Sequence, residues 1–214
     1  MIELEHFRTT QASYDTVAAD YAELVADELA RKPLDRALLG TFEELVRAAD
    51  VGPIADLGCG PGRVAAYLDK LGATVFGIDL SPVMIEMARR RHPHLRFETG
   101  SMTELDLPDQ SLGGVLAWYS TVHMPPDLLP VVFAEFHRVL APGGHLLMAF
   151  KIGNDSVHLD AAYGHPLSLD VYQFPLALVA DLLGAAGLVV ETQVTREPEG
   201  YEKTPQGYVL ARRR

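Results

Sequence analysis

The sequence predicts an α/β fold built on a mainly parallel sheet, and three observations support that prediction. Between Ile54 and Phe150, short apolar segments alternate strictly with amphipathic helical segments, as expected for parallel strands joined by crossover helices. The first of these apolar segments runs into a glycine-rich stretch that opens a helix. The last two apolar segments, "LVVETQVT" and "GYVLAR", are only about ten residues apart. That is too short for a crossover helix, so they should form an antiparallel hairpin.

The first 50 residues should form a helical cap. In "SYDTVAADYAELVADELARK" the apolar side chains recur at helical spacing, with Ser13 as the expected N-cap and Pro33 ending the helix. One face of this helix carries Tyr14, Val17, Ala18, Tyr21, Leu24, Val25 and Leu29. A second amphipathic helix, "LDRALLGTFEELVRAA", leads to the first strand.

The alternating region supplies five strands and three helices. We expect strands at Ile54 onward, "TVFGID", "LRFETG", "LGGVLAWY" and "HLLMAF", and helices at "RVAAYLDKLG", "PVMIEMARRR" and "LLPVVFAEFHRVLAPGG". Ser81 and Pro82 suit the cap and first position of the second of these helices. A further helix, "PLALVADLLGAAG", precedes the final hairpin. The expected fold is therefore a doubly wound sheet of seven strands, with an antiparallel last strand and helices on both faces.

Length and composition limit the class of protein. The 214 residues suit one domain, 1–214, and 48% hydrophobic with 22% charged residues is the balance of a soluble globular protein. A formal net charge of −11 argues against a nucleic-acid partner, which needs clustered positive charge. We see no membrane span, no signal peptide and no metal-ligand spacing in the chain. Cys59, the single cysteine, fits a cytoplasmic protein.

The glycine-rich stretch "IADLGCGPGRV" predicts a ligand site. Gly58, Gly60 and Gly62 follow the first strand, but a dinucleotide fingerprint would need a third glycine where Arg63 stands. Asp56, two residues before the loop, suits an ammonium or sulfonium better than a pyrophosphate. Asp79 ends the second strand, where an acid accepts hydrogen bonds from ribose hydroxyls. The expected ligand is a nucleoside with a cationic, amino-acid-like tail.

These motifs resemble those of a known family. "IADLGCGPGRV", "FGIDLS", "LPDQSLGGVLAWYSTVHM" and "HRVLAPGGHLLMAF" occur in the order found in class I S-adenosylmethionine-dependent methyltransferases, and the resemblance covers nearly the whole chain. It implies a seven-stranded sheet with a reversed last strand. It also implies methyl transfer from S-adenosyl-L-methionine, with S-adenosyl-L-homocysteine as product.

The resemblance carries over a set of cofactor-binding residues. Asp56, Gly58, Cys59, Gly60 and Gly62 would line the methionine end, Asp79 would hold the ribose, and Leu80 and Met84 would contact the adenine. Gly100, Ser101 and Met102 fall where the family often has an aspartate that bonds the adenine amino group, so Ser101 implies a weaker contact. Tyr14, Tyr21, Trp118 and Tyr119 complete the expected set.

The acceptor side is less defined by the sequence. His123 follows the fourth strand and is the candidate catalytic residue, as a base or a substrate hydrogen-bond partner; a structural histidine is the equal alternative. Residues 151–170 are expected to form a lid loop, and the expected substrate-binding residues are His158, Tyr163, His165 and Tyr172. Such covers favour a small organic acceptor, with an oxygen or nitrogen nucleophile expected before carbon.

Other functions remain open at this stage. A nicotinamide-dependent oxidoreductase shares the fold, but Asp56 and Arg63 argue against it. A catalytically silent protein that binds S-adenosylmethionine would keep the same loop. A protein or RNA methyltransferase is disfavoured by the acidic charge. The expected assembly is a monomer or a homodimer.

Overall fold

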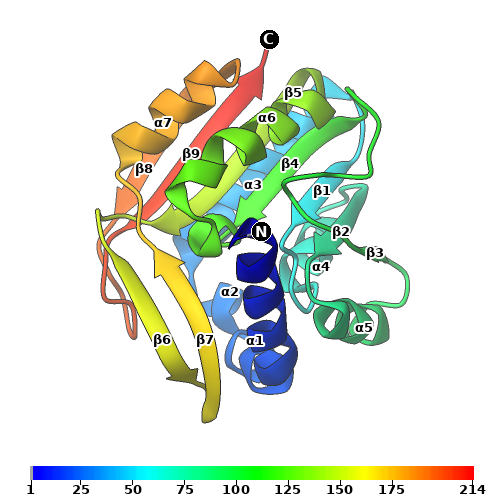
Figure 1. Cartoon of the computed structure of the whole chain (residues 1–214). Coiled ribbons are helices and arrows are strands. Elements are labelled where there is room, and N and C mark those ends of the chain that lie inside the picture. The colour runs from blue at the N-terminus through cyan, green and yellow to red at the C-terminus, as the bar shows by residue number, and fades with distance from the viewer. Residues whose placement is uncertain (1) are drawn as a thin grey trace.

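The computed structural model describes residues 2–214, with side chains from residue 5. Within that range, seven strands form one sheet in the order β3-β2-β1-β4-β5-β9-β8 (Figure 1). These strands are β1 (Ile54–Leu57), β2 (Val75–Asp79), β3 (Arg96–Thr99), β4 (Leu112–Trp118), β5 (Leu140–Lys151), β8 (Leu188–Arg196) and β9 (Gln206–Arg213). The first five run parallel, whereas β9 lies antiparallel to both β5 and β8. The predicted sheet, with its reversed last strand, is confirmed.

Helices cover both faces of the sheet. On one face lie α3 (Pro33–Ala49), α4 (Arg63–Lys70) and α5 (Pro82–Arg91), and on the other lie α6 (Leu129–Val139) and α7 (Leu176–Ala185). Two short 3-10 helices, η1 (Thr121–His123) and η2 (Pro126–Leu128), connect β4 to α6. The predicted cap of α5 is confirmed, because Ser81 Oγ accepts a hydrogen bond from the Met84 amide at 3.0 Å.

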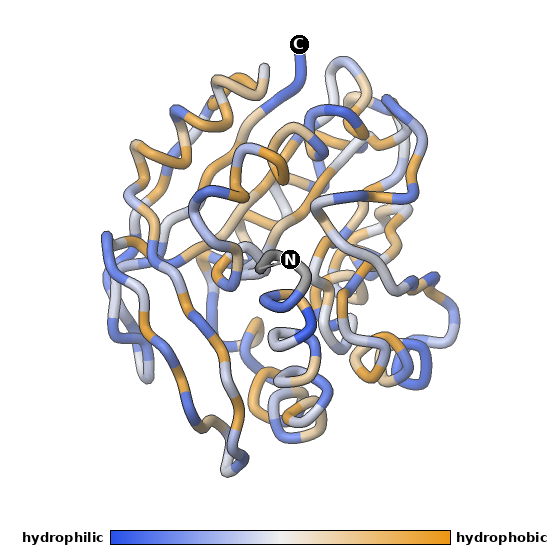
Figure 2. Tube along the Cα trace, in the orientation of Figure 1, coloured by the Kyte–Doolittle hydropathy of each residue, from blue (hydrophilic) through white to orange (hydrophobic). Residues whose placement is uncertain are grey.

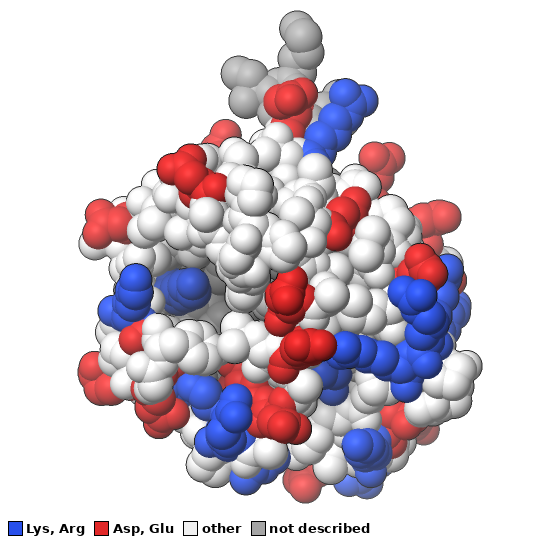
Figure 3. Space-filling view, turned by 90° about the horizontal axis from the view of Figure 1, so that it is seen from below, with Lys and Arg blue, Asp and Glu red and all other residues white. Residues whose placement is uncertain are grey.

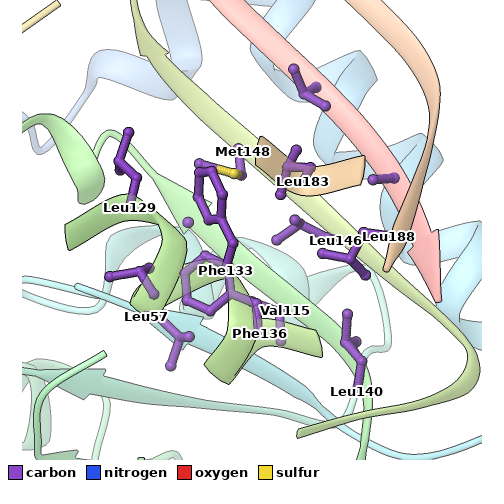
Figure 4. Packing of buried hydrophobic residues seen from close by; sticks show 14 of the residues in the cluster. Leu57, Val115, Leu129, Phe133, Phe136, Leu140, Leu146, Met148, Leu183 and Leu188 are labelled. Carbon is purple, nitrogen blue, oxygen red and sulfur yellow. The ribbon is translucent and has the colours of Figure 1, made fainter. Parts of the chain in front are cut away.

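The core lies between the sheet and these helices. β4 is buried along its whole length, as expected for a central parallel strand covered on both faces. In Figure 2 the most hydrophobic stretches follow the strands and the inner sides of α6 and α7. Figure 4 shows Phe133 and Phe136 of α6 between Met148 of β5, Val115 of β4 and Leu183 of α7. This packing covers one face of the sheet.

The N-terminal helix differs from its predicted bounds. α1 runs from Ile2 to Leu24, and a turn separates it from the short α2 (Glu28–Arg31). Ser13 therefore lies inside the helix, and its predicted role as N-cap is wrong. Its hydroxyl donates instead to the carbonyl of Ser168 at 2.9 Å, so a tertiary contact uses the group that a cap would need.

The segment predicted as a lid loop contains a regular element. Residues 151–170 include most of an antiparallel hairpin made of β6 (Ser156–Ala162) and β7 (His165–Tyr172), so an irregular loop was the wrong expectation. The sequence hid this hairpin because its residues are mostly exposed or half-buried, without the apolar alternation of a core strand. In Figure 1 the hairpin extends below the sheet beside α1. Whether it acts as a lid stays a prediction.

Candidate cofactor and acceptor site

A cavity lies at the edge of the sheet where the parallel strands end, closed by α1. It encloses about 830 Å³ of empty space that is partly open to solvent. Figure 3, which views this end of the molecule, shows acidic and basic side chains distributed over the surface. The cavity is lined by Phe7, Thr10, Tyr14, Tyr21, Leu57, Gly58, Gly60, Ile78, Asp79, Leu80, Met84, Gly100, Ser101, Met102, Trp118, Tyr119, Ser120, His123 and Met124.

Most of the lining was predicted, with some omissions. The sequence interpretation missed Phe7, Thr10, Leu57, Ile78, Ser120 and Met124. Four of these adjoin predicted residues in the chain. Phe7 and Thr10 precede Tyr14 by seven and four residues and lie on the same helix face. The helical spacing could have indicated them, but the predicted helix began only at Ser13.

Asp79 is held by two backbone donors. The amide of Gly60 donates to its Oδ2 and the amide of Ser81 donates to its Oδ1, both at 2.8 Å. Burial raises the pKa of this carboxyl, and the two hydrogen bonds oppose that shift. Each carboxylate oxygen keeps a further lone pair for a ligand. Asp79 thus ties the glycine loop to the start of α5 and stands on the cavity wall, where it can accept hydrogen bonds from a diol.

The three loop glycines serve different contacts. Gly60 has φ +53°, and a Cβ built on it would lie 3.8 Å from Tyr21 Cε1, in open cavity space. A Cβ on Gly62 would instead lie 2.7 Å from the Phe97 ring, and one on Gly58 would lie 2.3 Å from the Cβ of Ser120. Gly58 and Gly62 therefore permit close packing of the loop, whereas Gly60 leaves space for a ligand.

Buried polar groups without partners surround the same loop. Among the described residues, Asp56 Oδ2, Arg63 Nη1 and Ser120 Oγ have no hydrogen-bond partner. The other terminal nitrogen of Arg63, Nη2, pairs with Glu28 Oε2 at 2.7 Å. Burial raises the pKa of Asp56 to about 7, although the positive charge of Arg63 opposes the shift. The ammonium and the carboxylate of an amino acid would match the unused hydrogen-bonding capacity of this carboxylate, guanidinium and hydroxyl.

Three predicted cofactor residues lie behind the wall rather than on it. Within the described chain, Asp56, Cys59 and Gly62 do not line the cavity. Cys59 packs against Gly77, where an added Cβ would lie 2.6 Å from its Sγ, and burial raises the pKa of its thiol. These residues shape the loop. They can contact a ligand only through the backbone of the loop or after a local shift of the chain.

On the far side of the cavity, the residues after β3 offer mainly apolar contact. Ser101 Oγ lies 2.8 Å from Thr103 Oγ1 and accepts a hydrogen bond from the Thr103 amide at 3.3 Å. The serine hydroxyl is thus engaged in its own turn. Met102 lines the cavity together with Leu80 and Met84, which gives a flat ring system thioether and aliphatic neighbours.

Trp118 and Tyr119 belong to both the core and the cavity wall. Trp118 is buried and packs against Tyr208 with ring centroids 5.7 Å apart. Tyr119 has φ +56°, and its hydroxyl lies 3.2 Å from that of Tyr208, which donates to Asp35 at 2.9 Å. Tyr119 thus adopts a left-handed backbone conformation at the end of β4, with its side chain anchored to Tyr208.

His123 lies on the cavity wall with both ring nitrogens engaged. Its Nδ1 is 2.7 Å from the carbonyl oxygen of Asp170, and its Nε2 is 2.6 Å from the hydroxyl of Tyr14. The side chain of His6 contacts the backbone carbonyl of His123 at 2.7 Å. Burial lowers the pKa of His123 to about 4, so the imidazole is neutral near pH 7.

The four predicted substrate-binding residues lie outside the cavity lining of residues 5–214. His158 Nδ1 pairs with Asp170 Oδ1 at 2.7 Å, and His165 Nε2 pairs with Asp20 at 2.8 Å. Tyr163, at the hairpin turn, packs edge-on against Tyr21 at 5.9 Å. Tyr172 stacks on Phe174, with ring centroids 6.4 Å apart. His165 and Tyr163 thus hold the hairpin against α1, whereas the His158–Asp170 pair joins its two strands. The predicted contact of these residues with an acceptor stays a prediction.

Comparison with known proteins agrees with this geometry. Residues 54–144 match a family model described as a methyltransferase domain. The chain is 39% identical over 92 residues to demethylmenaquinone methyltransferase of Chlorobaculum parvum, covering 42% of this chain and 37% of that protein. It is 33% identical over 115 residues to N-demethylindolmycin N-methyltransferase of Streptomyces griseus, covering 51% and 48%. The chain thus spans less than half the length of these curated relatives.

A solved structure extends the likeness to nearly the whole fold. Magnesium protoporphyrin IX methyltransferase from Synechocystis PCC 6803, with bound S-adenosylmethionine, superposes with a TM-score of 0.71 and covers 95% of both chains. At 15% sequence identity, this likeness concerns the fold alone. As to membranes, the helices of the described residues include none that is long and apolar enough to cross one.

Proposed function

We propose that this chain, whose residues 54–144 match a methyltransferase domain, is a class I S-adenosylmethionine-dependent methyltransferase that methylates a small organic acceptor. The observation that carries the proposal is the cavity at the glycine loop. Asp79 presents a doubly anchored carboxylate there, and Gly60 leaves space above it. This arrangement suits a nucleoside whose tail is an amino acid.

Each part of the proposed cofactor has suitable neighbours. Leu80, Met84 and Met102 would contact the adenine, and Asp79 would accept hydrogen bonds from the ribose hydroxyls. Asp56 Oδ2 and Arg63 Nη1 lie unpartnered behind the cavity wall. After a local shift of the loop they would complement the ammonium and the carboxylate of the methionine end. S-adenosylmethionine, when bound, supplies a methyl group on a sulfonium that is already activated for displacement.

The protein's share of the reaction is alignment and exclusion of water. An in-line displacement needs the acceptor atom opposite the leaving sulfur, and a closed cavity holds it there. Tyr14 and Tyr21 of α1 form one wall, and another is formed at and after the end of β4 by Trp118, Tyr119 and His123. Oxygen and nitrogen nucleophiles suit these polar aromatic walls, and His123 remains the proposed acceptor-side residue.

The names of the relatives support a small acceptor. Demethylmenaquinone, demethylindolmycin and magnesium protoporphyrin IX are all small molecules, although they differ widely from one another. On the face of the molecule in Figure 3, acidic and basic side chains are mixed rather than gathered into a basic field such as a nucleic acid would need. The cytoplasmic location and the monomer or homodimer state stay predictions.

Two measurements test the proposal. Isothermal titration calorimetry should detect binding of S-adenosylhomocysteine and none of NAD. Incubation with S-adenosylmethionine and a metabolite mixture should release S-adenosylhomocysteine. Heat with NAD and none with S-adenosylhomocysteine would overturn the proposal. Binding without release would favour the alternative, a catalytically silent protein that binds S-adenosylmethionine.

A further inference from the structure

The two contacts of the His123 ring define where its proton is. A carbonyl oxygen can only accept a hydrogen bond, so Nδ1, at 2.7 Å from the carbonyl of Asp170, must carry the hydrogen. In the neutral imidazole Nε2 is then an acceptor. The hydroxyl of Tyr14, at 2.6 Å, therefore donates to Nε2.

This arrangement leaves His123 without a free nitrogen and Tyr14 with free lone pairs. The hydroxyl hydrogen of Tyr14 is committed to His123, and in the described residues the phenol oxygen has no other hydrogen-bond partner. Both residues line the cavity. Any proton that reaches His123 from the cavity must therefore pass through the hydroxyl of Tyr14.

We propose that Tyr14 is a catalytic residue that takes the proton of a neutral hydroxyl acceptor, or of a weakly basic amine, while it passes its own proton to His123. This inference rests on the proposed methyltransferase function and names the class of its acceptor. It also moves Tyr14 from the cofactor-binding set to the acceptor side, with His123 as the positioning residue behind it.

The step balances in atoms and charge. The lone pair of the acceptor atom forms the bond to the methyl carbon, and the carbon–sulfur bond breaks with its electron pair on sulfur. The acceptor's proton moves to the oxygen of Tyr14, and the hydroxyl proton of Tyr14 moves to Nε2 of His123. The positive charge of the sulfonium thus ends on the imidazole, whose Nδ1–H still donates to Asp170, and later leaves as a proton to solvent.

The surroundings of His123 suit a weak base. Burial lowers its pKa, the hydrogen bond to Asp170 on β7 opposes that shift, and Coulombic interactions with Lys151 on β5 and His6 on α1 lower the pKa further. A weak base is sufficient for these acceptors, because methylation turns a hydroxyl oxygen into a strongly acidic oxonium and a weakly basic amine nitrogen into an acidic ammonium. The proton therefore leaves readily once the new bond forms.

The same geometry disfavours anionic acceptors. A carboxylate has no proton to give, and its oxygens would face the lone pairs of Tyr14, which has already committed its hydrogen. An alcohol, a phenol or a neutral amine offers an N–H or O–H that Tyr14 can accept. The acceptor class is thus set by the direction of one hydrogen bond.

Nuclear magnetic resonance tests the relay without any acceptor. In the full-length protein with ¹⁵N-labelled histidine and bound S-adenosylhomocysteine, the ¹⁵N shifts of His123 should show the Nδ1–H tautomer. Tyr14→Phe should shift the Nε2 signal while S-adenosylhomocysteine affinity stays within about twofold. Tyr67→Phe, on α4 and away from the cavity, is the matched control and should shift neither. An Nε2–H tautomer would overturn the relay, even if S-adenosylhomocysteine binds and the methyltransferase function stands.

An acceptor panel tests the substrate class. The wild type is incubated with S-[methyl-³H]adenosylmethionine and phenols, alcohols, amines or carboxylic acids. Neutral donors should be methylated. Tyr14→Phe should lower kcat about 100-fold or more with little change in the KM for S-adenosylmethionine, the usual loss for general base catalysis. His123→Gln should show the same split between kcat and KM. The assignment would be overturned if only carboxylic acids were methylated, or if none of the neutral donors were. It would also be overturned if Tyr14→Phe methylated the neutral donors as fast as the wild type.

Discussion

Replacing Gly60 by Ala places one methyl group in the proposed cofactor site. The substitution acts on folding and on binding by separate routes. The backbone at Gly60 has φ +53°, and a left-handed conformation costs a residue with a Cβ about 1 kcal/mol. In the described structure the nearest atom to the added carbon is Tyr21 Cε1 at 3.8 Å, an ordinary van der Waals contact. We therefore expect the free energy of unfolding to fall by only about 1 kcal/mol.

The effect on the ligand should be larger. The methyl group occupies space that the ligand needs, and an extra carbon in a close-fitting site costs about 1–3 kcal/mol. That corresponds to an increase of roughly 5-fold to 150-fold in the Kd for S-adenosylhomocysteine, measured by calorimetry.

Two other glycines make the comparison specific. Gly143→Ala has a similar backbone strain at φ +86°, and its Cβ would meet no described atom within 4 Å, so it should lose stability but keep its affinity. Gly62→Ala should lose more stability, because its Cβ would lie 2.7 Å from the Phe97 ring. Unchanged affinity in Gly60→Ala, with the protein folded by circular dichroism, would refute a cofactor at this loop.

Four further predictions follow from the site. Asp79→Ala should weaken S-adenosylhomocysteine binding by about 1–3 kcal/mol in calorimetry, because it removes charged hydrogen bonds; equal affinity would exclude the ribose role. The pKa of Asp56 is about 7, so affinity should fall about tenfold per pH unit below 7 as the carboxyl protonates, and Asp56→Asn should bind weakly without this dependence. Between pH 6.5 and 4 the unfolded chain takes up a proton that folded His123, with its pKa of about 4, does not. The free energy of unfolding, measured with urea, should therefore fall by about 3 kcal/mol more in the wild type than in His123→Asn over that pH range. Equal decreases in the two proteins would contradict a neutral imidazole. Amide exchange in the β6–β7 hairpin and α1 should slow when S-adenosylhomocysteine binds, and equal protection in both states would indicate a preformed pocket rather than a lid.

Much of the cofactor side could be predicted because its signals are local in the chain. The glycine loop follows β1 directly, Asp79 ends β2, and Ser81 caps α5 two residues later. Parallel strands end at one edge of their sheet, so residues at successive strand ends meet without further information. Predicted residues from β1, β2, β3 and β4 do converge on one cavity.

The acceptor side could not be predicted in the same way because its contacts join distant segments. Tyr14 reaches His123 across 109 positions of sequence, and His165 reaches Asp20 across 145. A histidine or tyrosine in an exposed hairpin looks the same in the sequence whether it faces a cavity or a neighbouring helix. In this fold His158 and His165 pair with carboxylates outside the cavity lining of the described residues.

By itself the sequence determined the α/β architecture, the reversed last strand and the loop that would hold a nucleoside. These features follow from hydrophobic periodicity and from the residues at strand ends. Both signals arise from interactions between residues only a few positions apart in the chain. Only the tertiary structure decided that α1 closes the cavity, that residues 156–172 pair as a hairpin, and that Tyr14 donates to His123. The direction of that hydrogen bond depends on the carbonyl of Asp170, which the fold brings to the far side of the ring.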